Sequence, residues 1–126
     1  MPDRPLFDVS LVPLTMVYEV GNTIFVSGHI PIEPDGRLSS GDIAHQTDLV
    51  LLTIRERLEQ IGSGFDDVVK VTVLLADAVR DFPVMNEVYG RHFSTLPRPS
   101  RTTLGVQLAV DVLIEVEMIA VRGHRV

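Results

Sequence analysis

The chain of 126 residues contains no cysteine, which excludes a disulfide framework and any thiolate chemistry. No apolar run approaches the ~20 residues that a membrane-spanning helix needs. The N-terminal segment MPDRPLFDVS lacks the basic region and apolar core of a signal peptide. We therefore expect a protein with neither a membrane span nor a signal peptide, located in the cytoplasm.

Positive charge is also scarce. The chain has 11 basic and 17 acidic residues, a formal net charge of −6. Binding to nucleic acid generally needs a basic patch that neutralises phosphates, and the longest basic cluster here is the short tail VRGHRV. The charge balance therefore argues against a nucleic-acid partner.

Several catalytic motifs are missing as well. Ser27, in VSGHIP, lacks the flanking glycines of a nucleophile elbow, and the glycines of the N-terminal third do not form a phosphate-binding loop. The histidines show no metal-ligand spacing; they are His29, His45, His92 and His124. His92 falls on an apolar stripe, where we expect a satisfied core or interface residue.

The residues that are present follow regular periods. The stretch MVYEV-GN-TIFVS predicts two strands joined by a tight turn at Gly21-Asn22. IPIEPDGRL continues as a broken edge, because its prolines cannot donate ladder hydrogen bonds and Asp35-Gly36 favours a turn. Lys70 to Ala76 predicts a largely apolar, central strand.

Two segments predict helices. Between 43 and 61, apolar residues recur at helical spacing, with Ser40 or Asp42 as the cap and Gly62 at the left-handed stop position. From about Asp81 to Phe93, Asp81 is the expected cap and Pro83 lies in the first turn. The stripe expected to face the core contains Phe82, Met85, Tyr89 and His92 or Phe93.

RTTLGVQL and VLIEVEMIAV predict two final strands joined at residues 109–111. The order of elements is therefore β-β-α-β-α-β-β. Because there is no repeat, no low-complexity tract and no long linker, we expect a single α+β domain spanning 1–126, with helices packed on a mixed sheet.

Arg101 begins the first of these two strands. If the strands pair around Val110, then Arg101, Gly105, Glu115 and Glu117 share one face, and Gly105 leaves room beside Glu115. An arginine fork with a carboxylate beyond it describes a site for a small carboxylic acid. The pattern alone slightly favours a plain ion pair between Arg101 and the nearer Glu117, and a surface position for Arg101 also stays open.

Four ordered motifs carry a family resemblance over roughly Pro13 to Arg122. They are GNTIFVSGHIP, GDIAHQTDLVLLTIRERLEQIGSGFDDVVKVTVLLAD, DFPVMNEVYGRHF and RPSRTTLGVQLAVDVLIEVEMIA. With them the chain resembles the RidA (YjgF) family. The resemblance implies a chorismate-mutase-like fold, with two helices on one face of the sheet, assembled as a homotrimer with ligand sites between subunits.

The resemblance also implies an activity: hydrolysis of reactive 2-enamino and 2-imino acids, such as 2-aminoacrylate and 2-iminopropanoate, to 2-oxo acids and ammonia without a cofactor. By the same resemblance Arg101 grips the substrate carboxylate and Glu115 positions the hydrolytic water. The positions that match the family's substrate-binding residues are Ser27, Gly28, Asn86, Thr103 and Leu14.

Some positions depart from the family pattern. Leu14 replaces a tyrosine that commonly reaches the site, and His29 stands where glutamine is usual. These departures leave the preferred substrate open. A regulatory protein that binds small carboxylic acids without turnover is the alternative, and an endoribonuclease or translation inhibitor, a role attached to relatives, is the least favoured because of the net charge.

Overall fold

A computed structural model describes residues 4–124; residues 1–3 and 125–126, including the end of the basic tail, lie outside the described residues. The elements follow the expected order, with two added 3₁₀ turns. In chain order they are η1 (Val9–Leu11), β1 (Val17–Val20), β2 (Thr23–His29), α1 (Ile43–Gln60), η2 (Phe65–Asp67), β3 (Val68–Leu75), α2 (Ala78–His92), β4 (Ser100–Gly105) and β5 (Ile114–Val121).

The N-terminal hairpin is confirmed. β1 pairs antiparallel with β2, and Val20 lies opposite Thr23. Gly21 has a φ of 56°, a left-handed conformation that glycine adopts without steric cost. Beyond β2, the broken edge is confirmed too: a single bridge joins Ile32 to Leu38, and Gly36 turns the chain with a φ of 87°.

Helix α1 also matches its prediction. Of the two candidate caps, Asp42 is the one used: its carboxylate accepts a 2.9 Å hydrogen bond from the main-chain N–H of His45. Gly62 follows the helix with a φ of 74°. Val50, Ile54 and Leu58 are fully buried against the sheet, so the helical stripe in the sequence is the core face of α1.

The prediction for the start of α2 was wrong. The helix begins at Ala78 and is capped by Asp77, whose side chain accepts a hydrogen bond from the N–H of Arg80. Asp81 instead lies inside the helix and makes a two-pronged ion pair with the Arg80 guanidinium. Because the helix begins earlier, Pro83 falls in its second turn rather than its first.

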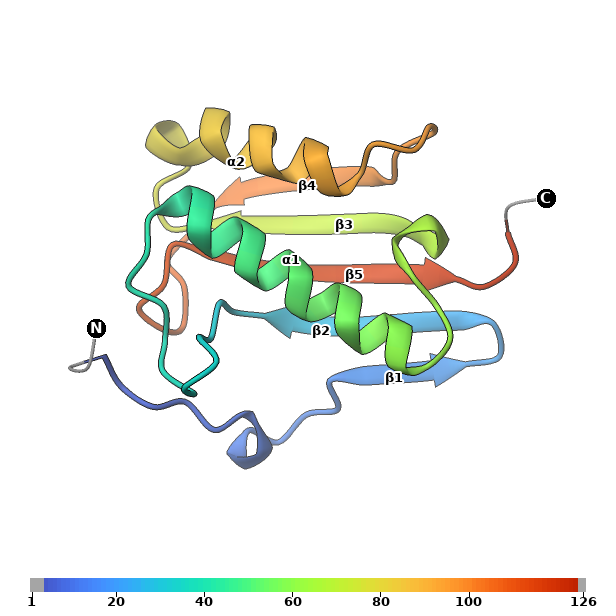
Figure 1. Cartoon of the computed structure of the whole chain (residues 1–126), viewed down its shortest axis with the longest axis horizontal. Coiled ribbons are helices and arrows are strands. Elements are labelled where there is room, and N and C mark those ends of the chain that lie inside the picture. The colour runs from blue at the N-terminus through green and yellow to red at the C-terminus, as the bar shows by residue number, and fades with distance from the viewer. Residues whose placement is uncertain (1–3, 125–126) are drawn as a thin grey trace.

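The predicted C-terminal hairpin was also wrong. The strand order is β1-β2-β5-β3-β4, so β3 lies between β4 and β5 (Figure 1). β4 runs parallel to β3, and β5 runs antiparallel to it. The physical reason is burial: β3 and β5 alternate buried residues and suit the centre of the sheet, whereas β4 is short, polar and mostly exposed, and suits an edge.

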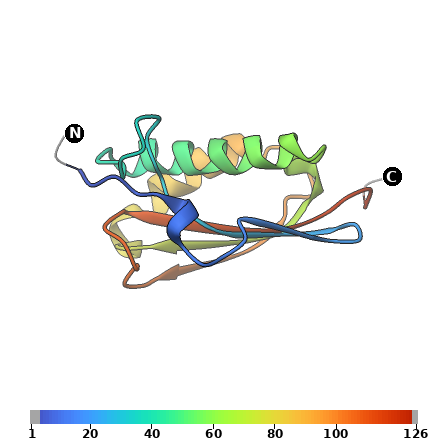
Figure 2. The same ribbon diagram turned by 90° about the horizontal axis from the view of Figure 1, so that it is seen from below.

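Both helices cover the same face of this sheet, and within residues 4–124 no helix covers the other face (Figure 2). The core lies between the two layers and includes Val71, Val73, Val116, Met118 and Met85. Large apolar side chains on the uncovered face remain exposed: Tyr18 is 59% exposed, Phe25 45% and Leu104 48%. Within residues 4–124 no helix is long and apolar enough to cross a membrane.

Candidate functional site

Arg101 lies on the edge strand β4 and faces helix α2. Its Nη2 donates a 2.7 Å hydrogen bond to Oδ1 of Asn86. The guanidinium carbon lies 4.6 Å from the centre of the Tyr89 ring and 5.9 Å from that of Phe82. Arginine stacks well on aromatic faces, so these contacts fix the orientation of the group. The half-buried cation is therefore held by one amide and two rings.

The expected neighbours of Arg101 on the sheet need correction. Arg101 is level with Val71 of β3, which faces the helices, whereas Glu117 is level with Thr72, on the opposite face. Among residues 4–124 no ion pair joins Arg101 to any carboxylate, so the plain Arg101–Glu117 salt bridge is excluded within one chain. The cation has no carboxylate partner in the described chain.

Two further residues of β4 share the helix-covered side with Arg101. Thr103 lies two positions along, level with Val73, and is half-buried. The sequence pattern predicts that Gly105 leaves room beside Glu115, and this prediction is wrong. A Cβ at Gly105 would come within 2.9 Å of the Cβ of Ala78, so this glycine accommodates the start of α2.

Glu115 lies on the opposite face of the sheet, on β5. It is level with Leu74, and its carboxylate lies against Gly28 of β2, where an added Cβ would overlap Oε2 of Glu115. Burial, reinforced by the negative charge of Glu117, raises the pKa of the Glu115 carboxyl above its ordinary value. The glycine therefore makes room for a half-buried carboxylate of increased basicity.

The segment before β1 runs alongside Glu115 and Gly28. Ser27 donates a 2.6 Å hydrogen bond from its hydroxyl to the carbonyl of Thr15, and its N–H donates to the carbonyl of Met16. These bonds hold the Leu14–Met16 segment beside the β-bulge between Val26 and His29. Ser27, Gly28, Leu14 and Glu115 thus occupy one region of the molecule.

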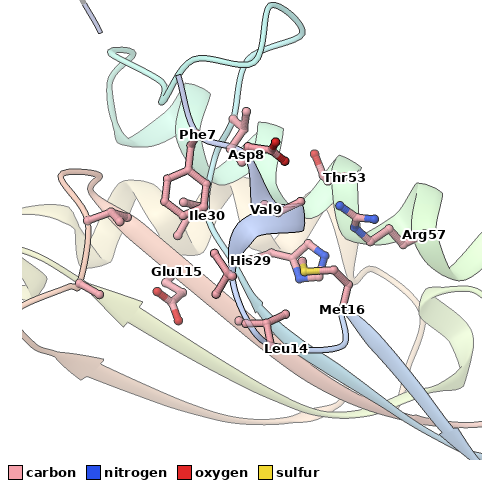
Figure 3. A pocket seen from close by; sticks show the side chains of 15 residues that line it. Phe7, Asp8, Val9, Leu14, Met16, His29, Ile30, Thr53, Arg57 and Glu115 are labelled. Atoms are coloured by element: carbon pink, nitrogen blue, oxygen red, sulfur yellow. The ribbon is translucent and has the colours of Figure 1, made fainter. Parts of the chain in front are cut away.

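A cavity of about 490 Å³ opens beside this region (Figure 3). Gly28, Leu14 and Glu115 line it, together with residues of η1 and the strand β2. Its dimensions fall in the range of small-molecule sites in proteins. Figure 3 shows Glu115 at one end of this space and Arg57 at the other, with Leu14 and His29 between them.

His29 is buried and fixed in one tautomer. Burial lowers its pKa to about 4, so the ring is neutral near pH 7. Nδ1 lies 2.6 Å from the carbonyl oxygen of Ser27, which can only accept, so Nδ1 carries the proton. His29 therefore supports the bulge that carries Ser27 and Gly28. His92 is a satisfied residue, as expected: Nε2 lies 2.8 Å from Oδ1 of Asp48 and Nδ1 accepts from Arg55.

The predicted site residues therefore form two separate groups. Arg101, Asn86 and Thr103 lie between β4 and α2, while Glu115 lies two strands away on the other face. At ~4.8 Å between strands and ~3.4 Å per residue along them, the Cα atoms of Arg101 and Glu115 are roughly 14 Å apart. Because their side chains point to opposite faces, one chain cannot bring them to the same small ligand.

Sequence reasoning missed the aromatic support of Arg101 and the N-terminal wall of the cavity. Phe82, Asn86 and Tyr89 are spaced by four and three residues, so helical periodicity places them on one side of α2, and that signal was available. Phe7, Val9 and Val12 line the cavity but carry no motif, and only the folded path of the chain reveals them.

Comparison with known proteins shows the family. A family model described as Endoribonuclease L-PSP matches residues 8–122. A RutC family protein of Pyrococcus abyssi is 47% identical over 110 residues, covering 86% of this chain and 85% of the relative. The 2-iminobutanoate/2-iminopropanoate deaminase of Homo sapiens is 37% identical over 113 residues, covering 88% and 81%. The crystal structure of RidA from a Psychrobacter species has a TM-score of 0.81 and 31% identity, covering 88% and 89%. This chain therefore belongs to the RidA (YjgF) family.

Proposed function

We propose that the protein is a cofactor-independent deaminase that hydrolyses reactive 2-enamino and 2-imino acids to 2-oxo acids and ammonia. One observation carries the proposal: Arg101 presents a half-buried guanidinium, oriented by Asn86 and Tyr89, with no carboxylate partner among residues 4–124. Such a group suits the carboxylate of a small acid. The similarity to the human 2-iminobutanoate/2-iminopropanoate deaminase supports the same chemistry.

We further propose that the active site forms between copies of the chain in a homotrimer. Because Arg101 and Glu115 of one chain cannot reach the same ligand, the proposed site takes Arg101 from one copy and Glu115 from the next. The uncovered sheet face supports assembly, because Tyr18, Phe25 and Leu104 expose apolar surface there. In this proposal residues 1–126 act as one RidA-like domain in the cytoplasm.

Imines hydrolyse in water without a catalyst, so the site needs mainly to position the imine carbon and the attacking water. Arg101 binds the substrate carboxylate and places the imine carbon beside Glu115. The Glu115 carboxylate accepts a proton from water as the oxygen attacks that carbon, giving a carbinolamine. Starting from the protonated imine, this carbinolamine is neutral, and the Glu115 carboxyl returns its proton to the nitrogen. The C–N bond then breaks with its electron pair going to ammonia, while the Glu115 carboxylate takes the hydroxyl proton as the C=O bond of the 2-oxo acid forms and passes it to the departing ammonia. Ser27, Gly28, Asn86, Thr103 and Leu14 line the two halves of this site.

The assay compares catalysed with spontaneous hydrolysis. An amino-acid oxidase generates the imine in the presence of the protein, and the release of ammonia and 2-oxo acid is followed. We expect a rate clearly above that of buffer, and a rate equal to buffer for all imines would contradict the proposal. Binding of 2-oxo acids in calorimetry without any turnover would support the regulatory alternative instead.

An endoribonuclease is the activity in the description of the matching family model. The net charge of −6 disfavours it, since RNA binding relies on phosphate neutralisation. Cleavage of RNA by this protein at low salt would require the function to be revised.

The raised pKa of Glu115 gives a prediction for the pH profile. Glu115 acts as a base only when it is deprotonated, so activity should fall as the pH falls through its pKa. Because burial and Glu117 raise that pKa, the acid limb should lie above the range of an ordinary glutamate. Replacing Glu117 with glutamine removes the repulsion and should move the acid limb of kcat/KM to lower pH. An unchanged acid limb would show that another group controls it.

A further inference from the structure

The cavity beside Glu115 lies between the sheet, which contributes residues of β2 and β5, and the N-terminal segment, which contributes residues between 7 and 16. Its wall comes from the strand β2 and the residues after it, from α1 through Thr53 and Arg57, from the loop before β5, and from η1, which crosses over it (Figure 3). The apolar residues of this wall are Phe7, Val9, Val12, Leu14, Met16, Ile30, Ile32, Ala109 and Val110. The space is therefore enclosed mainly by hydrocarbon.

Apart from Glu115 and Arg57, the polar residues of the wall offer little to a ligand. The Nε2 of His29 is covered by neighbouring atoms and the His29 ring is neutral; of the Arg57 guanidinium only Nε is covered, and this group lies at the opposite end of the cavity from Glu115 (Figure 3). The Thr53 hydroxyl donates a 2.9 Å hydrogen bond to the carbonyl of Leu49 within α1. Asp8 accepts hydrogen bonds from the N–H and hydroxyl of Ser10. Glu115 is thus the polar group most directly available at its end of the cavity.

We propose that this cavity receives the side chain of the substrate and selects 2-imino acids with long or branched apolar side chains, such as those derived from leucine and methionine. This inference depends on the proposed deaminase function. When the imine carbon lies beside Glu115, the only substituent that can enter an apolar space is the side chain. The methyl group of 2-iminopropanoate fills little of a cavity of about 490 Å³, whereas an isobutyl group buries three more carbons.

Leu14 contributes to this selectivity. It is 48% exposed and lines the cavity close to Glu115 (Figure 3). The family resemblance leads one to expect a tyrosine at this position, and a phenol would bring a hydroxyl to the same wall. Leucine keeps the wall apolar, which favours a hydrocarbon side chain over a polar one.

The test compares imines generated from alanine, 2-aminobutanoate, leucine, methionine and glutamate. We expect kcat/KM for the leucine-derived imine to exceed that for the alanine-derived imine at least about tenfold, because each buried methylene contributes ~10-fold or more to discrimination. The glutamate-derived imine should gain less than the leucine-derived imine, since its second carboxylate must leave water for a wall that is mostly hydrocarbon.

Two neighbouring residues of η1 provide a matched pair of variants. Val9 lines the cavity, whereas Leu11 is 81% exposed and does not line it. Val9→Phe should lower the leucine-to-alanine ratio of kcat/KM at least about tenfold, and Leu11→Phe should leave that ratio unchanged. Val110→Phe fills the cavity from the opposite wall and should act like Val9→Phe, which covers the case in which one variant fails to fold.

The outcomes separate this inference from the function on which it rests. If the wild-type protein turns over no imine, the proposed function fails. If it turns over the alanine-derived and leucine-derived imines equally well, and both phenylalanine variants fold yet keep that ratio, the deaminase stands and the side-chain cavity is refuted. Thermal unfolding of each variant shows whether it is folded.

Discussion

Arg101→Ala should reduce kcat/KM for any 2-imino acid by about two orders of magnitude or more. Hydrogen bonds to a charged group contribute about 1.5–3 kcal/mol each, and the guanidinium fork can make two of them with a carboxylate. Losing both corresponds to about 3 kcal/mol or more, and each 1.4 kcal/mol is a factor of ten. Arg101→Lys keeps the charge but not the fork, so it should recover only part of the loss.

The experiment needs a control for charge and for folding. Arg91 is exposed near the end of α2, and Arg91→Ala removes one positive charge without touching Asn86 or Tyr89. Steady-state kinetics should show Arg91→Ala close to wild type. Thermal unfolding should show that Arg101→Ala remains folded, because the lost contacts lie at an edge strand. A folded Arg101→Ala protein with nearly wild-type kcat/KM would contradict the role of Arg101.

Local features of the fold could be predicted from the sequence because short-range chemistry determines them. Gly21 takes the left-handed conformation that its hairpin turn needs, and Asp42 caps the helix that its spacing predicts. The start of α2 was misplaced because Asp77 and Asp81 are both acceptable caps by residue type. Only the path of the chain out of β3 decides between them.

The choice of strand partners could not be predicted from local pattern. RTTLG and IEVEMIA follow one another in the sequence and therefore predict a hairpin, yet β3 lies between them. The inferred common face for Arg101 and Glu115 depended on that pairing and failed with it. The family motifs single out both residues, but a motif carries no information about whether the two meet within one chain.

The site itself could be predicted only in part. The family resemblance marks Arg101, Asn86, Ser27, Gly28 and Glu115 as candidates, and the structure groups them into two clusters. The cavity could not be foreseen, because its cover comes from the N-terminal segment, whose apolar residues follow no regular period. Packing of that segment over the end of β2 is a tertiary effect.

The shared site predicts that two inactive variants restore activity when they assemble together. Arg101→Ala lacks the carboxylate anchor, and Glu115→Gln lacks the base, so each homotrimer should be inactive. In a mixed trimer, a site that takes Arg101 from a Glu115→Gln chain and Glu115 from an Arg101→Ala chain contains both native residues. Random mixing in equal amounts should place both in about a quarter of the sites of a cyclic trimer.

The most direct measurement is therefore the imine hydrolysis rate of the two variants produced together with different affinity tags. After tandem purification and mass spectrometry to verify mixed oligomers, a chain carrying both substitutions, co-assembled with Arg101→Ala, serves as the inactive control. Because tandem purification removes the homotrimers and each mixed trimer has one complete site of three, we predict that the purified mixture recovers about a third of the wild-type rate. Mixed trimers no more active than either variant alone would contradict a site built from Arg101 of one copy and Glu115 of the next.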